Sequence, residues 1–170
     1  MRTTHRLDLL LLPEHIDQDV DPVAFAFIAD GWIGGGLLAH RPGGLGPGPA
    51  ANALLPGGFA ALRLDRPGAA TLYANEQGGF RAPCPRCGAP LAGPLGAAVE
   101  AWRRGGPRAL TCPRCGWAGD LSAIQGQPPF GIARAAVIFA DVGGVDLSSL
   151  GQEALAALLG AARVVLRRPS

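Results

Sequence analysis

The chain has 170 residues, a formal net charge of +2 and a hydrophobic content of 48%, which is enough for a folded core. All 15 basic residues are arginine, which indicates a coding bias, so arginine is weaker evidence of phosphate recognition than usual. The longest early apolar run, Leu9–Leu12, is too short for a membrane-spanning helix or a signal-peptide core. We therefore expect a cytoplasmic protein without membrane segments.

Two elements are predicted before the first glycine-rich stretch. Residues 5–12 indicate a buried strand that Pro13 ends. Asp21 and Pro22 are typical of a helix start, since aspartate caps free N–H groups and proline suits the first helical position. The run that follows is apolar on every side, so a buried helix ending near Gly31 is favoured, and a strand remains open.

Residues 31–58 contain ten glycines and four prolines, and we expect them to form a flexible loop. A phosphate-binding loop is rejected, because neither Gly-Lys-Ser/Thr nor a G-x-G-x-x-G sequence after a strand is present. Phe59–Asp65 then indicates a strand, residues 66–68 (Arg-Pro-Gly) a tight turn, and Thr71–Ala74 the second arm of a hairpin.

All four cysteines lie in two copies of Cys-Pro-Arg-Cys-Gly, at residues 84–88 and 112–116. Each copy places two thiols three positions apart, and the following glycine allows a tight turn that aims both sulfurs at one point. Two facing turns supply four sulfurs for a tetrahedral metal ion, and the 24 residues between the pairs only slightly exceed the usual spacing. The predicted metal ligands are Cys84, Cys87, Cys112 and Cys115.

The doubled motif resembles the knuckles of the zinc-ribbon superfamily, and it is similar to the knuckles of rubredoxin, which hold iron in the same geometry. The resemblance covers about residues 80–120 and implies four cysteine ligands, with each knuckle on a β-hairpin. We favour one zinc ion per chain over iron, because rubredoxins are acidic and rich in aromatic residues, whereas this segment is basic with one Phe and two Trp. Four thiolates close the coordination shell, which argues for a structural site. Two disulfides and thioredoxin-like redox chemistry are the disfavoured alternatives.

The cysteine-containing segment is also the most basic part of the chain. Residues 80–117 hold six arginines and one acid, Glu100, a formal charge of +5, against −3 for the rest. This charge is expected either to steer an anionic partner or to form an ordinary solvated surface. The candidates for nucleic-acid phosphate contacts are Arg81, Arg86, Arg103, Arg104, Arg108 and Arg114. Trp117 is expected to pack around the metal, and base stacking is the alternative.

The remaining elements complete an α+β pattern. Between the cysteine pairs, residues 96–104 predict a short helix and residues 108–111 a strand. After them, Ile132–Ala140 indicates a strand, Ser149 with Gln152 resembles a capping box that opens an amphipathic helix, and residues 163–168 indicate a final strand.

This order predicts a small α+β sandwich, similar to the ferredoxin-like class, that pairs the N-terminal strand with C-terminal elements. We expect residues 1–79 and 121–170 to form one domain together, and residues 80–120 to form the inserted zinc ribbon that the resemblance implies.

No assembled catalytic set is visible. The three histidines, His5, His15 and His40, lie in the first 40 residues, and neither G-x-S-x-G nor H-E-x-x-H occurs. His15 is interpreted as a surface residue, although the acids near it leave a hydrolase site open. We expect a non-enzymatic binding or adaptor protein whose ribbon is a zinc-stabilised platform for another macromolecule, most simply a protein. The alternatives are a nucleic-acid-binding ribbon and a rubredoxin-like electron carrier.

Overall fold

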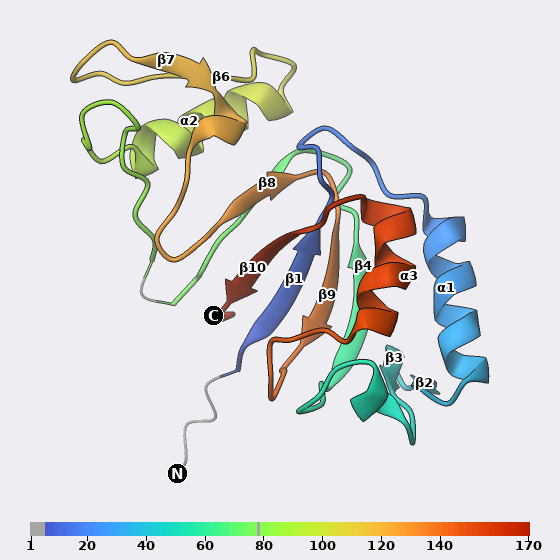
Figure 1. The fold of residues 1–170 in the computed structure, drawn as a ribbon. Coiled ribbons are helices and arrows are strands. Elements are labelled where there is room, and N and C mark those ends of the chain that lie inside the picture. The colour runs from blue at the N-terminus through green and yellow to red at the C-terminus, as the bar shows by residue number, and fades with distance from the viewer. Residues whose placement is uncertain (1–5, 78) are drawn as a thin grey trace.

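The computed structural model describes residues 6–77 and 79–170, so His5 lies outside the described residues (Figure 1). The helices and strands are β1 (Asp8–Leu12), α1 (Pro22–Gly34), β2 (Leu38–Arg41), β3 (Gly44–Pro47), β4 (Ala61–Asp65), β5 (Thr71–Tyr73), α2 (Ala92–Arg103), β6 (Ala109–Thr111), β7 (Ala118–Asp120), β8 (Gly131–Ala133), β9 (Ala136–Ala140), α3 (Ser149–Leu159) and β10 (Arg163–Arg167). Two short 3-10 helices span Ala51–Ala53 and Leu121–Ala123. The protein is therefore of the α+β class, as predicted.

Six strands form one antiparallel sheet in the order β10-β1-β9-β4-β3-β2. The first and last strands of the chain are neighbours, with Asp8 opposite Arg167 and Leu12 opposite Arg163. On its other side β1 pairs with β9, where Leu10 lies opposite Ile138. The predicted pairing of the N-terminal strand with C-terminal elements is therefore present.

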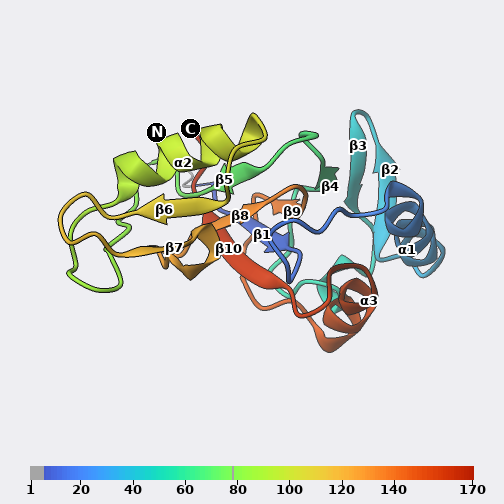
Figure 2. The same cartoon turned by 90° about the horizontal axis from the view of Figure 1, so that it is seen from above.

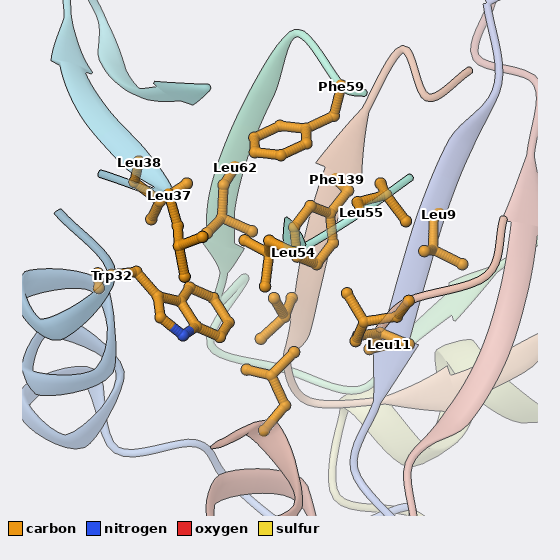
Figure 3. Close-up of a cluster of buried hydrophobic side chains, with 14 of the residues drawn as sticks. Leu9, Leu11, Trp32, Leu37, Leu38, Leu54, Leu55, Phe59, Leu62 and Phe139 are labelled. Carbon is orange, nitrogen blue, oxygen red and sulfur yellow. The ribbon is translucent and has the colours of Figure 1, made fainter. Parts of the chain in front are cut away.

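Helices α1 and α3 cover one face of this sheet, while α2 and the β6–β7 hairpin lie toward the other (Figure 2). Leu9, Leu11 and Phe139 belong to the hydrophobic core on the helical face, which Phe59 and Trp32 help to fill (Figure 3). The rings of Phe59 and Phe139 meet edge to face with centroids 5.2 Å apart. Since alternate strand residues face opposite sides, the odd-numbered leucines of β1 point to this core.

Helix α1 begins as the sequence predicts, with Pro22 at its first position and the Asp21 side chain accepting the N–H of Val23 at 2.9 Å. It continues to Gly34, beyond the predicted end at Gly31, because the burial of Trp32 on the sheet holds the extra turn. Phe27 remains 81% exposed on its outer side, so the uniform apolar character does not mean that the helix is buried on every side.

The second face of the sheet is covered by β5 and β8, which pair with each other. Tyr73 and Ala133 pack there against Leu10, Ile138 and Val165. The predicted hairpin of β4 with β5 is therefore wrong: β4 pairs with β9 instead. Burial explains the difference, because β5 crosses to the second face and buries Tyr73, whose hydroxyl donates to Asp65 at 2.8 Å.

The predicted strand Ile132–Ala140 is two strands, because the chain bends at Arg134 and passes from the second face into the sheet. β8 belongs to the pair with β5, and β9 is a central strand of the large sheet.

Helix α3 is capped by Ser148 rather than Ser149, with the Ser148 side chain accepting the N–H of Gly151 at 3.3 Å. Burial of Leu155 against the sheet sets this helix register.

Residues 31–58 differ from the expected flexible loop, because they contain the end of α1, the β2–β3 hairpin and a 3-10 helix. The glycines serve defined geometry in this segment. Gly43 and Gly44 have φ values of 89° and 146° at the hairpin turn. A Cβ on Gly48 would lie 2.3 Å from the carbonyl oxygen of Gly36, so this residue allows two backbone segments to approach closely.

Candidate metal centre

The cysteines lie in an excursion of the chain that leaves the sheet through β5 and returns through β8 (Figure 1). These strands pair antiparallel, with Tyr73 opposite Gly131. Beyond them the two chain segments meet again at Arg81 and Gln127, whose N–H and C=O groups exchange hydrogen bonds of 2.8 and 2.9 Å. The cysteine segment is therefore carried on a paired stem, which we call the β5–β8 stem.

The two cysteine turns are nearly identical in geometry. In each, the glycine N–H donates to the carbonyl of the first cysteine at 2.9 Å, Gly88 to Cys84 and Gly116 to Cys112. The φ values of Gly88 and Gly116 are 70° and 71°, the left-handed region that glycine adopts readily. The second turn joins the β6–β7 hairpin, as expected for a knuckle, whereas the first is supported by a single bridge between Pro83 and Pro90.

These turns bring the four predicted ligands together. The sulfur of Cys84 lies 3.8 Å from that of Cys115, and the sulfur of Cys87 lies 3.8 Å from that of Cys112. All four sulfurs lie within 4.8 Å of one another. A tetrahedral ion with metal–sulfur bonds of about 2.3 Å requires sulfur–sulfur edges of about 3.8 Å. The four cysteines are therefore positioned to bind one metal ion.

The surroundings of the sulfurs shift the pKa values of Cys84 and Cys115 in opposite directions. Burial alone would raise the pKa of the Cys84 thiol, but the N–H groups of Cys87 and Arg86 and the neighbouring thiols outweigh it and lower the pKa to about 7. At Cys115 the Trp117 N–H favours the thiolate, but burial and the other sulfurs raise the pKa to about 11. A divalent cation placed between the sulfurs would favour thiolates over thiols, because it compensates their negative charge.

A small hydrophobic core supports the metal centre from α2. This helix spans Ala92–Arg103, starting four residues before the predicted one, and it buries Leu95 and Val99. They share a buried cluster with Cys84 and Cys112 and with Ile16 from the loop after β1. Trp117 is half-buried and packs against the same cluster, in agreement with its predicted packing role. The hydrophobic core of the cysteine segment therefore extends to the loop after β1.

The structure divides the six candidate arginines into two groups. Arg103 pairs with Glu100 at 2.7 Å. Arg108 pairs with Asp120 at 2.7 Å and with Asp17 at 3.5 Å, which ties the cysteine segment to the loop after β1. No ion pair within residues 6–77 and 79–170 involves the other four, which are exposed: Arg81, Arg86, Arg104 and Arg114. The arginines are therefore not one equivalent set.

Trp102 is a structural residue that the sequence reasoning missed. The guanidinium of Arg108 lies 6.0 Å from its ring centroid, and that of Arg134 lies 5.9 Å from it. Arg134 comes from the bend between β8 and β9, so the contact joins the cysteine segment to the sheet. The position of Trp102 among basic residues was a signal for such a contact, but the sequence pattern does not identify Arg134, 32 positions later, as its partner.

No protein-family model, curated protein or solved structure matches the chain. In the part of the chain that the structure describes, the four cysteines are the one group of three or more potential ligands placed to share a metal ion, and no helix has the length and apolarity needed to cross a bilayer. His15 and His40 are both exposed. The function is therefore argued from the metal centre and its surface.

Proposed function

We propose that this protein is a cytoplasmic, non-enzymatic binding or adaptor protein whose cysteine segment, residues 80–120, is a zinc-stabilised interaction platform. The observation that carries the proposal is the closed shell of four sulfurs within 4.8 Å of one another. Four thiolates leave no coordination position for water or substrate, so the metal shapes a surface rather than a reaction. A macromolecular partner, most simply a protein, would contact that surface.

The fold supports the matching division of the chain. Within residues 1–79 and 121–170, the order β10-β1-β9-β4, with α1 after β1 and α3 after β9, supports assignment to the ferredoxin-like class, which has the connectivity β-α-β-β-α-β. The β2–β3 hairpin extends that sheet at one edge. The repeated knuckles and the β6–β7 hairpin support a zinc ribbon inserted between β5 and β8. We therefore assign the two parts as one ferredoxin-like domain and one ribbon.

Metal analysis of the full chain, purified without added metal, tests the centre directly. One zinc per chain, with four thiols protected until unfolding, is expected. One iron with a coloured protein would instead favour a rubredoxin-like electron carrier. Absence of metal, with oxidised thiols in a freshly reduced extract, would overturn the proposal.

A second candidate function is nucleic-acid binding, and the unpaired arginines favour it. Arg86 and Arg114 lie in the two cysteine turns, and both are exposed. Guanidinium groups in this setting are free to contact phosphates. Protein and nucleic-acid partners differ in their response to salt, because each phosphate contact steepens the salt dependence of affinity.

The experiment compares binding of a single-stranded oligonucleotide from low to moderate salt. The variant is Arg86→Gln with Arg114→Gln, and the matched control is Arg6→Gln with Arg63→Gln, which removes two exposed arginines outside the ribbon. For nucleic-acid binding, the ribbon variant should flatten the slope of log affinity against log salt by about 1.4, and the control should not. Absent or salt-independent binding would remove this candidate and leave a protein partner.

A further inference from the structure

Strand β10 forms one end of the six-stranded sheet, and its outer edge is open. Its five residues pair with β1 on one side, from Arg163 to Arg167. Within the described chain, no other backbone hydrogen bond reaches residues 163–167. Alternate residues of an antiparallel strand direct both N–H and C=O to the same side. The open donors and acceptors are therefore those of Val164 and Leu166, which an added strand would satisfy. The next outward position, Arg168, is already covered, because its N–H and C=O bond to residues 75 and 76.

An apolar groove of about 530 Å³ lies beside this edge, on the helical face of the sheet. Its floor is formed by β1 and β10 and its wall by α3, through Leu9, Leu11, Val164, Leu166, Leu155 and Ala156. In Figure 1, α3 lies over the middle of the sheet and leaves β10 beyond it. The groove volume falls in the range of natural ligand pockets, and its lining is mainly apolar like theirs.

The apolar side chains at this groove are incompletely covered. Val164 is 53% exposed on β10, and Val145 is 39% exposed on the loop before α3. Two lining residues have short side chains, Ala156 on α3 and Ala162 just before β10, and they leave space between the helix and the strand. An occupant that removed these valines from water would gain hydrophobic stabilisation.

The open edge and the groove together select an extended peptide as the occupant. A peptide paired along β10 would place alternate side chains over the groove and the others on the opposite face. Five paired residues span about 17 Å. A small apolar molecule would fill the groove but leave the strand's donors and acceptors to water. The geometry therefore calls for apolar residues at every second position.

The charges on and near β10 indicate which residues would lie between the apolar positions of the peptide. β10 contains no acid, and neither Arg163 nor Arg168 has an ion pair among residues 6–77 and 79–170. The Arg163 guanidinium instead donates to the carbonyls of Pro13 at 2.8 Å and Ile132 at 2.9 Å, on the face opposite the groove. An acidic side chain paired beside Arg163 would compensate this charge. Asp146 lines the groove on the α3 side and disfavours an acid there.

We propose that β10 and the adjacent groove bind an extended peptide segment of another protein, which adds a seventh strand to the sheet. Its alternate apolar side chains occupy the groove, and its intervening acidic side chains lie beside Arg163. This site is separate from the ribbon, so the proposal stands independently of the metal-centred function.

The probe is a phage-displayed library of random eight-residue peptides, selected on the immobilised full chain purified with zinc. The expected result is enrichment of sequences that alternate apolar and acidic residues. A synthetic peptide of the enriched sequence should slow hydrogen exchange at the amides of Val164 and Leu166, because these N–H groups face the open edge. The same peptide with proline at alternate positions should not bind, since proline lacks the N–H donor.

Two exposed valines give a matched pair of variants. Val164→Glu places a charge at the groove, and the affinity of the synthetic peptide should fall by about tenfold or more. Val23→Glu makes the same change on α1, where Val23 is 74% exposed, and affinity should stay within about twofold. Zinc content should be one per chain in both variants, so a failure of the groove proposal is distinguishable from a failure at the cysteines.

The proposal is overturned if the library yields no enriched sequence, or if enriched peptides bind the Val164→Glu variant as well as the unmodified chain. Protection from exchange at other elements, with the amides of Val164 and Leu166 unchanged, would also overturn it. Light scattering tests the remaining occupant: a dimer of the unmodified chain that Val164→Glu converts to a monomer would assign the edge to a second copy, and the peptide proposal would then be wrong.

Discussion

Replacing Gly116 with alanine isolates the energetic cost of the cysteine-turn conformation. Gly116 has a φ of 71°, and a Cβ added there would meet no heavy atom within 4 Å. The penalty is therefore that of a left-handed backbone in a residue other than glycine, about 1–2 kcal/mol. Because the metal-bound turn requires this conformation and the unfolded chain does not, metal affinity should weaken by about 5- to 30-fold.

The assay is competition for zinc between the full chain and a chromophoric chelator. Gly88→Ala should weaken metal binding by a similar factor, since Gly88 has a φ of 70° and equally open surroundings. Gly96→Ala is the control, because Gly96 lies within α2 without positive φ or close neighbours, and alanine there favours the helix by about 1 kcal/mol. Zinc affinity of Gly116→Ala equal to that of the unmodified chain, or equal weakening in Gly96→Ala, would refute the reasoning.

Three further predictions concern stability. Leu95→Ala removes a fully buried side chain from the core beside the cysteines and should lower the free energy of unfolding of this segment by about 2–5 kcal/mol, measured by denaturant titration. An effect below about 1 kcal/mol would contradict the packing argument. Asp8→Asn should cost about 3 kcal/mol in the same assay, because it leaves the Arg167 guanidinium, 3.0 Å away and 14% exposed, without its closest carboxylate. Burial alone would raise the pKa of Asp120, but hydrogen bonds from Ser122 and Arg108 outweigh it and hold this pKa below its usual value. The resulting stabilisation is complete above the ordinary carboxyl pKa and is lost as the pH falls through the lowered one. NMR titration should show the Asp120 pKa rising in Arg108→Gln, and an unchanged value would contradict the assignment.

The grouping of the four cysteines was predictable because the geometry of each turn is local. Each C-x-x-C-Gly turn fixes two sulfurs through its own backbone hydrogen bond, and the chain has no other cysteine to confuse the pairing. The helix start at Asp21 was predictable for the same reason, since a cap involves neighbouring residues. Local geometry of this kind is determined by a few consecutive residues.

Pairings between distant segments were not predictable. β5 follows β4 after a proline–glycine turn, which locally favours a hairpin, yet Tyr73 pairs opposite Gly131 and packs on the second face of the sheet. The glycines of residues 31–58 likewise suggest flexibility until the close approach of Gly48 to Gly36 is known. In both cases the structure depends on a contact with residues outside the local segment, and a local sequence pattern does not reveal such a contact.

The β5–β8 stem has a consequence for how the chain folds. About 57 residues separate Tyr73 from Gly131, and bringing the ends of so long a flexible loop together is entropically unfavourable. A folded cysteine segment, closed at Arg81 and Gln127, reduces the flexible part to about ten residues. By the logarithmic dependence on loop length, closure then becomes easier by about 1.5 kcal/mol, roughly tenfold in equilibrium. Metal binding at the cysteines would therefore favour formation of the six-stranded sheet, because β4 and β9 pair across the same insertion.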